Sequence, residues 1–301
     1  MEKWESGKVE VIKFTSILKA TALEVLSEPL SLLVLLTALV MTVFAPAFHY
    51  HQFGEPTRMA RDAGFSALFA CGGVLAVFAT IRAFRREVES GTLEMALAHP
   101  ISRAGFFCAK TAGAVAAYLV FVFVVFGTQL TVVWGAAVGG RLAQQTGDIA
   151  HVYGPAFAAG IGVIVLPLVL AAVLNRFFNF RFVLTSFATA LVLALICGGT
   201  ASAWAPRLVA PYPSVAILVA CPALVLLAAS AAFALRFKAN AAASLAGIVF
   251  VAMLPFVGNY YLSDALTGGG SVSFLYAVCA CLVALPAVAG FLLLGASWRK
   301  L

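Results

Sequence analysis

Long unbroken runs of apolar residues constrain this chain more than any other feature of its sequence. The runs from Leu30 to Phe48 and from Leu184 to Ala203 contain no charged side chain. About 20 residues in a helix rise roughly 30 Å, which is the thickness of the hydrocarbon core of a bilayer. Strands of a membrane barrel would instead alternate apolar and polar residues over about ten positions. The runs therefore predict an all-α integral membrane protein.

The composition excludes the other broad classes. Of the 301 residues, 63% are hydrophobic and 10% are charged, whereas a soluble domain is about 45–50% apolar and about a quarter charged. Disordered chains have few apolar residues and many charges, so disorder is excluded as well. The net charge of +7 does not by itself indicate nucleic acid, and no nucleic-acid partner is expected. The six cysteines show no CxxC spacing, so neither a disulfide framework nor a metal site is predicted.

The apolar runs predict a polytopic helix bundle with about eight transmembrane helices. Six spans plus a re-entrant hairpin would fit the same pattern. Residues 1–29 form a polar N-terminal segment, and residues 30–301 form a single transmembrane domain. The third run is too long for the bilayer, because its 29 residues would rise about 43 Å, so this helix is expected to tilt or to protrude. The eight spans are drawn at about 30–48, 63–81, 111–139, 154–174, 182–203, 214–235, 241–262 and 273–297.

The distribution of lysine and arginine predicts the orientation in the membrane. Of the 19 basic residues, only Arg58, Arg61, Arg141 and Arg207 fall on one side of the eight spans, and the other 15 fall on the opposite side. Basic residues are enriched in cytoplasmic loops. Both termini are therefore expected in the cytoplasm, in a multi-pass protein of the plasma membrane, which is the inner membrane in a bacterium.

Residues from about 8 to 28 predict an amphipathic helix that lies along the cytoplasmic interface. Val11, Phe14, Leu18, Ala22 and Val25 fall within one narrow arc of a helical wheel. Membrane lipid is thus an expected partner of this segment. The alternative is a helix that packs on its own protein. A proline disfavours helix at the preceding residue, so a break is expected before Pro29.

The first cytoplasmic loop, residues 82–110, is the most polar stretch of the chain. Gly91 and Thr92 predict the start of a short helix, and Glu94 lies in its first turn, where an acid suits the helix dipole. Leu93 and Leu97 share one face of this helix, which Pro100 ends. Apolar side chains surrounded by carboxylates suit the docking of a soluble partner.

The same loop resembles the first cytoplasmic loop of ABC-2 type permeases, the membrane subunits of many bacterial ATP-binding-cassette exporters. Two segments carry the resemblance: an acidic pair followed by Gly-Thr-Leu-Glu, and Pro-Ile-Ser-Arg followed by Lys110. The N-terminal helix that ends before Pro29 is also similar to the connecting helix of that family. The residues that this resemblance would place at or beside an ATPase contact are Glu87, Glu89, Gly91, Thr92, Leu93, Glu94, Pro100 and Arg103.

The resemblance implies a transport subunit that works with other chains. The short helix would couple to a separate cytoplasmic ATPase, and two permeases, identical or different, would pair around a shared pathway. No G-x-x-x-x-G-K-[ST] pattern occurs in the sequence. The chain is therefore expected to carry no cofactor, and ATP and magnesium would bind to the partner ATPase. The expected function is the movement of a hydrophobic or amphiphilic substrate, in the export direction, by alternating access.

Two other classes of function remain open. An ion-coupled secondary transporter is the first alternative. A charged residue at the centre of a membrane helix costs roughly 2.5–3.5 kcal/mol, so it persists where ion coupling needs it. No such charge lies inside the drawn spans. An integral membrane enzyme or scaffold is the second alternative, although no catalytic constellation and no metal site is evident. The polar residues within the spans that could line a substrate path are Thr128, Gln129, Thr131 and Asn259. Such groups more often hydrogen-bond neighbouring helices.

Overall fold

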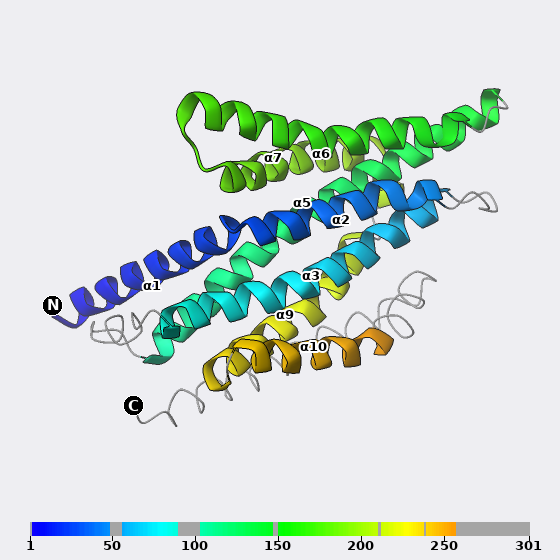
Figure 1. Ribbon diagram of the computed structural model, residues 1–301. Helices are drawn as coiled ribbons and strands as arrows, with labels where there is room; N and C mark the ends of the chain where they lie inside the picture. The colour runs from blue at the N-terminus through cyan, green and yellow to red at the C-terminus, as the bar shows by residue number, and fades with distance from the viewer. Residues whose placement is uncertain are drawn as a thin grey trace. The chain divides into compact units, whose positions relative to one another are not determined.

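A computed structural model describes residues 2–48, 56–89, 103–146, 150–209, 212–237 and 239–256 of the chain. Within these ranges the regular structure is entirely α-helical, and no strand is present (Figure 1). The prediction of an all-α fold is therefore confirmed. The helices are α1 (Glu2–Leu26), α2 (Pro29–Phe48), α3 (Pro56–Glu89), α5 (Arg103–Thr146), α6 (Ala150–Phe178), α7 (Phe182–Trp204), α8 (Pro206–Val209), α9 (Tyr212–Arg236) and α10 (Ala239–Phe256).

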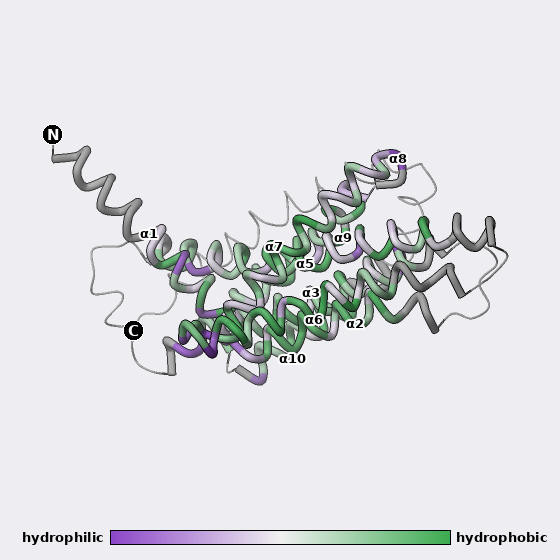
Figure 2. The backbone as a smooth tube through the Cα atoms, turned by 90° about the horizontal axis from the view of Figure 1, so that it is seen from above, coloured by the Kyte–Doolittle hydropathy of each residue, from purple (hydrophilic) through white to green (hydrophobic). Residues whose placement is uncertain are grey.

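Five of the described helices are long and apolar enough to cross a membrane. These spans lie within α3, α5, α6, α7 and α9, and the broken pair α1–α2 would make a sixth. Helix α10 contains a shorter apolar segment. Hydrophobic residues dominate the middle of the long helices, and hydrophilic residues lie toward their ends (Figure 2). The last predicted span, 273–297, falls outside the described residues.

The break before the first span lies where the sequence places it. Helix α1 ends at Leu26 and α2 begins at Pro29. The carbonyl of Glu28 accepts hydrogen bonds from the amides of Ser31 and Leu32 at 3.1 and 3.4 Å. The first turn of α2 therefore starts from Glu28, and Pro29 occupies the first helical position, where its missing N–H leaves no bond unmade.

Close packing divides the chain into two compact units. The first consists of residues 1–25, 73–118 and 221–301, and the second of residues 26–72 and 119–220. Helices α3, α5 and α9 each contribute residues to both units. The division into residues 1–29 and 30–301 made from the sequence concerns membrane association rather than packing, and it stays a prediction.

The first unit has an apolar core between α3, α9 and α10. Val77, Ile81 and Phe84 of α3 are buried there, together with Leu226 of α9. The remaining buried members are alanines of α9 and α10, namely Ala231, Ala234, Ala242 and Ala246. Such small side chains let helix backbones approach closely. The core lies directly beside the residues of α3 that lead into the loop after Glu89.

The second unit contains the antiparallel pair α2 and α6 and a close crossing of α5 with α7. Phe44 of α2 meets Phe157 of α6 edge to face, with ring centroids 5.4 Å apart. At the crossing, a Cβ on Gly198 would lie 3.0 Å from the Cα of Gly127, and a Cβ on Gly127 would lie 2.5 Å from the carbonyl oxygen of Ala194. Only residues without a side chain fit at this point.

Candidate functional site

The structure describes both ends of the predicted coupling loop but not its middle. Glu87 and Glu89 lie in the last turn of α3, and Arg103 is the first residue of α5. The residues of the predicted short helix and its proline, Gly91, Thr92, Leu93, Glu94 and Pro100, lie outside the described residues. The described site is therefore the place where the loop leaves α3 and enters α5.

A buried lysine joins α5 to α3 at this place. The side chain of Lys110 is 2% exposed, and its Nζ donates a hydrogen bond to the carbonyl oxygen of Ala83 at 2.5 Å. The same Nζ lies 5.6 Å from the ring centroid of Phe84 and 5.8 Å from that of Phe106. Both distances fall within the roughly 6 Å range of cation–π attraction. The ammonium group is thus held by a carbonyl dipole and two aromatic faces.

The aromatic rings around Lys110 continue into the apolar core of the first unit. Phe84 stacks on Phe107 at a centroid distance of 6.0 Å, and Phe106 meets Phe107 edge to face at 5.7 Å. Phe84 also belongs to the core between α3, α9 and α10. We call these five residues, Ala83, Phe84, Phe106, Phe107 and Lys110, the loop base.

Helix α1 packs against α5 one turn beyond the loop base. A Cβ on Gly113 would lie 2.7 Å from the carbonyl oxygen of Leu18 and 2.7 Å from the Cβ of Thr21. Thr21 itself is 2% exposed. The two backbones meet only because residue 113 has no side chain. The predicted interfacial helix is therefore in contact with the helix that carries the loop.

An ion pair also links α1 to α3. Glu24 accepts a hydrogen bond from Arg86 at 2.9 Å, and the arginine side chain is 66% exposed. An exposed pair of this kind contributes little to stability, on the order of 0–1 kcal/mol. This pair is therefore a minor contribution to the contact between α1 and α3.

The loop base is a mainly hydrocarbon contact between α3 and α5. Its polar group is already hydrogen-bonded, and its other members are hydrocarbon. Across the part of the chain that the structure describes, no group of three or more His, Cys, Asp or Glu side chains could hold a metal ion. A displacement of the loop would pull directly on α3 and α5, because both helices end at the loop and are joined just behind it.

The polar residues of the third span are fully or almost fully buried. Thr128 and Thr131 donate hydrogen bonds to carbonyl oxygens one turn earlier in α5, at 2.8 and 2.9 Å. The amide nitrogen of Gln129 donates to the carbonyl oxygen of Arg61 on α3 at 2.8 Å, and its side chain packs where a Cβ on Gly64 would lie. Asn259 lies outside the described residues. A role for these residues in a substrate path stays a prediction.

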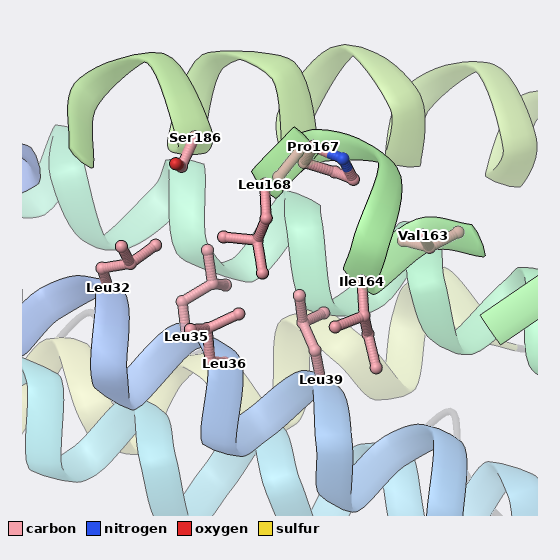
Figure 3. Close-up of a pocket in the computed structure, with 10 residues that line it drawn as sticks. Leu32, Leu35, Leu36, Leu39, Val163, Ile164, Pro167, Leu168 and Ser186 are labelled. Carbon is pink, nitrogen blue, oxygen red and sulfur yellow. The ribbon is translucent and has the colours of Figure 1, made fainter. Parts of the chain in front are cut away.

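An apolar cavity between α2, α6 and α7 is too small to hold a substrate. Leucines of α2 face residues of α6, and Ser186 of α7 lies at one end (Figure 3). Its volume is about 10 Å³, which is at most enough for a single water molecule. These helices are therefore tightly packed against one another in this conformation.

Sequence reasoning placed Lys110 in the loop but missed its burial. The signal was present, because this lysine stands within an otherwise apolar stretch that begins at Gly105.

A family model of the ABC-2 family transporter proteins matches residues 37–272 of the chain. The search of curated proteins and the search of solved structures each gave no match.

Proposed function

Because the chain belongs to the ABC-2 family of transporter proteins, and is therefore an integral membrane permease of an ABC transporter, we propose that its first cytoplasmic loop, residues 82–110, docks a separate cytoplasmic ATPase. The docking part is the segment from Glu87 to Arg103. ATP and magnesium would then bind to that ATPase. The permease would work in a pair, either with a second copy of this chain or with a related permease.

The loop base is the observation that carries this proposal. Lys110 and the aromatic rings join α3 to α5 immediately behind the loop, so a docked partner would act on two long helices at once. Helix α5 has 44 residues, which rise about 66 Å. This length exceeds the bilayer core by a wide margin, so α5 is suited to carry a movement from a docked ATPase into the membrane.

The proposed orientation places the loop and both termini in the cytoplasm and the protein in the plasma membrane. The support is the distribution of basic residues, of which 15 of the 19 fall on the proposed inner side of the eight drawn spans. The loop side would then be the side where ATP is available. The predicted ATPase-coupling residues lie on that side as well.

The proposed substrate is hydrophobic or amphiphilic, and the proposed direction is export. The polar side chains of the third span are already hydrogen-bonded within the protein, so they offer few partners to a small ion. ATP-driven closure of the ATPases would move the loop helix as a lever. The membrane helices then alternate between two states, because ATP closure makes contacts in one state that are absent in the other.

The test is a pull-down of the tagged full-length chain from its native membrane in mild detergent, with ATP hydrolysis assayed in the eluate. We expect a soluble-type ATPase in stoichiometric amount and vanadate-sensitive hydrolysis. Glu94→Arg should abolish the association while the permease stays folded, because a reversed charge opposes the charge of its partner. Asp264→Arg makes the same change of charge in a predicted external loop, so it should retain the ATPase.

Three results would contradict the proposal. Normal ATPase binding by Glu94→Arg would remove the docking role of the loop. Reproducible absence of any ATPase from an intact, dimeric permease would instead favour an ion-coupled transporter. A cysteine at Glu28 that is labelled from outside intact cells would reverse the proposed orientation.

A further inference from the structure

The spans in α6 and α7 are the least buried of the five long apolar spans among the described helices. Only 22% of the α6 span and 28% of the α7 span are buried, compared with 78% of the α3 span. The two helices pack against each other along their length. Between them runs a groove with a volume of about 480 Å³, which we call the α6–α7 groove.

The α6–α7 groove is lined by hydrocarbon along its whole length. Leucines of α6, such as Leu166 and Leu170, form one wall, and small residues such as Ala188 leave space on the α7 side. The two threonines in the lining donate to backbone carbonyls: Thr185 donates to Arg181, and Thr189 lies 2.8 Å from the carbonyl oxygen of Thr185. Their hydroxyl hydrogens are therefore already used, and the rest of the lining is hydrocarbon, so the groove suits an apolar chain.

The length of the groove matches one leaflet of a bilayer. Its lining on α7 runs from Leu184 to Ile196, a rise of about 18 Å. Half of the hydrocarbon core is about 15 Å thick. An acyl chain that enters from one face would therefore lie in the groove for its full length.

The groove ends at an unusual turn between α6 and α7, residues 175–182, which we call the Arg–Phe turn. Its sequence is Asn-Arg-Phe-Phe-Asn-Phe-Arg-Phe. The side chains of Phe177, Phe178 and Phe180 are all more than half exposed, and Phe180 lines the end of the groove. Three exposed aromatic rings beside two arginines suit the boundary between headgroups and acyl chains, where apolar bodies are buried and charged tips reach the polar layer.

The Arg–Phe turn is held in one conformation. The side-chain amide of Asn175 donates to the carbonyl of Phe180 at 2.6 Å, and the amide of Asn179 donates to the carbonyl of Asn175 at 3.1 Å. Asn179 has a φ of 55°, a conformation that asparagine adopts more readily than most residues. These bonds define the backbone of the turn from which Arg176 and Arg181 extend.

Arg176 and Arg181 flank the groove end without an acidic neighbour in the sequence. No aspartate or glutamate occurs between Asp148 and Asp264. Both arginines are exposed, and neither makes an ion pair with any residue that the structure describes. The charge of the Arg–Phe turn itself is therefore purely positive. A phosphate-bearing headgroup beside an apolar chain is the ligand that complements this arrangement.

We propose that the α6–α7 groove binds an anionic phospholipid, with one acyl chain between the helices and the headgroup phosphate at Arg176 and Arg181. The lipid belongs to the leaflet on the side of the Arg–Phe turn, which the positive charges of the sequence predict to be the cytoplasmic leaflet. It is a bound component of the permease, and its binding requires neither ATP nor the ATPase.

The test uses the full-length chain in phosphatidylcholine nanodiscs that contain phosphatidylglycerol with a photoreactive diazirine on its acyl chain. Labelled peptides are identified by mass spectrometry, and photoreactive phosphatidylcholine is the reference probe. We expect preferential labelling of residues 166–196 by phosphatidylglycerol. Each arginine near a membrane surface contributes about 1 kcal/mol toward anionic lipid, so Arg176→Gln or Arg181→Gln should lower the preference about fivefold, and the double variant about 25-fold.

Matched variants separate the groove from the general lipid surface. Ala188→Phe fills the groove and should abolish the preferential labelling of residues 166–196 by phosphatidylglycerol. Leu195→Phe adds the same ring on the exposed face of α7 outside the groove lining, and it should leave labelling unchanged. Arg207→Gln removes an exposed arginine that lies outside the Arg–Phe turn, so it should keep the anionic preference. Elution from a sizing column checks that each variant is folded.

Three results would overturn the proposal. Equal labelling by the two lipids would show ordinary contact with the bilayer. A preference for phosphatidylglycerol that survives Ala188→Phe would place the acyl chain elsewhere. A disulfide between two copies of Ala188→Cys would show that a second permease covers the groove. Each of these results leaves the ATPase pull-down unaffected, so the two proposals fail independently.

Discussion

The contact between Lys110 and Phe84 provides a quantitative test of the loop base. The effect of the single change Lys110→Met is hard to interpret, because it removes both a stabilising and a destabilising contribution to the free energy of unfolding. A hydrogen bond from a charged donor contributes about 1.5–3 kcal/mol, and taking an ammonium group out of water costs several kcal/mol. Methionine makes neither contribution. We therefore expect Lys110→Met to change the free energy of unfolding by only about 1 kcal/mol, in either direction.

The coupling between the two residues can be isolated by a double-mutant cycle. Cation–π attraction ranges from about 0.5–1 kcal/mol at exposed sites to about 2 kcal/mol when desolvated. Lys110 is almost fully buried, but its Nζ lies 5.6 Å from the Phe84 centroid, near the outer limit. We expect a coupling energy of about 1 kcal/mol between Lys110→Met and Phe84→Leu. Phe84→Leu should thus be less harmful when residue 110 is methionine.

Unfolding in mixed detergent micelles by increasing fractions of dodecyl sulfate, followed by tryptophan fluorescence, measures this coupling. The control cycle pairs Lys110→Met with Phe78→Leu, because Phe78 lies on the same helix and is half exposed. Its coupling should be below about 0.3 kcal/mol, as for independent sites. Equal coupling in the two cycles, or none in either, would refute the assignment of Lys110 to the face of Phe84.

Three further predictions use the same titration. Gly113→Ala should lower stability by about 1–3 kcal/mol, because the new Cβ would overlap α1. The control Gly247→Ala places its Cβ in open space, so it should be neutral or stabilising. Equal effects of the two changes would contradict the close approach of α1 to α5 at Gly113. Glu24→Gln should lower the free energy of unfolding by less than about 1 kcal/mol, and high salt should remove the difference in stability between the variant and the original protein. A loss above about 2 kcal/mol would be inconsistent with an exposed ion pair. Gln129→Leu should change the free energy of unfolding by less than about 1 kcal/mol. The variant loses one hydrogen bond, but it also removes a buried amide oxygen for which the described residues offer no hydrogen-bond partner. A larger loss of stability would show that this oxygen does have a partner.

The membrane helices could be predicted from the sequence because lipid leaves the backbone few choices. A long apolar run must satisfy its own hydrogen bonds, so it becomes a helix. The limits of the helices were harder to predict. Helix α3 begins at Pro56 and ends at Glu89, well beyond the predicted span 63–81, because charged residues end a hydropathy run without ending a helix. The four-residue helix α8, Pro206–Val209, lies in a predicted loop and shows no apolar run at all.

The loop base could not be predicted, because its contacts join distant parts of the sequence. Lys110 bonds to Ala83, which lies 27 residues earlier, and no local pattern marks that pairing. The same holds for Gly113, which is one of 25 glycines and is distinguished only by the helix that crosses it. Hydropathy and spacing describe each helix separately, whereas burial depends on which helix faces which.

Phe84 links the loop base to the core of the first unit, because its ring contacts both. The ring of Phe84 forms one wall around Lys110 and also packs among the buried residues of α3, α9 and α10. Packed interiors resist small deformations and change instead between discrete arrangements. A pull on the loop therefore cannot shift α3 alone. It must either leave this core intact and carry α9 and α10 along, or break the contacts of Phe84 on one side. The alanines of α9 and α10 favour the second course, because small side chains form no interlocking ridges that would anchor one helix against its neighbour.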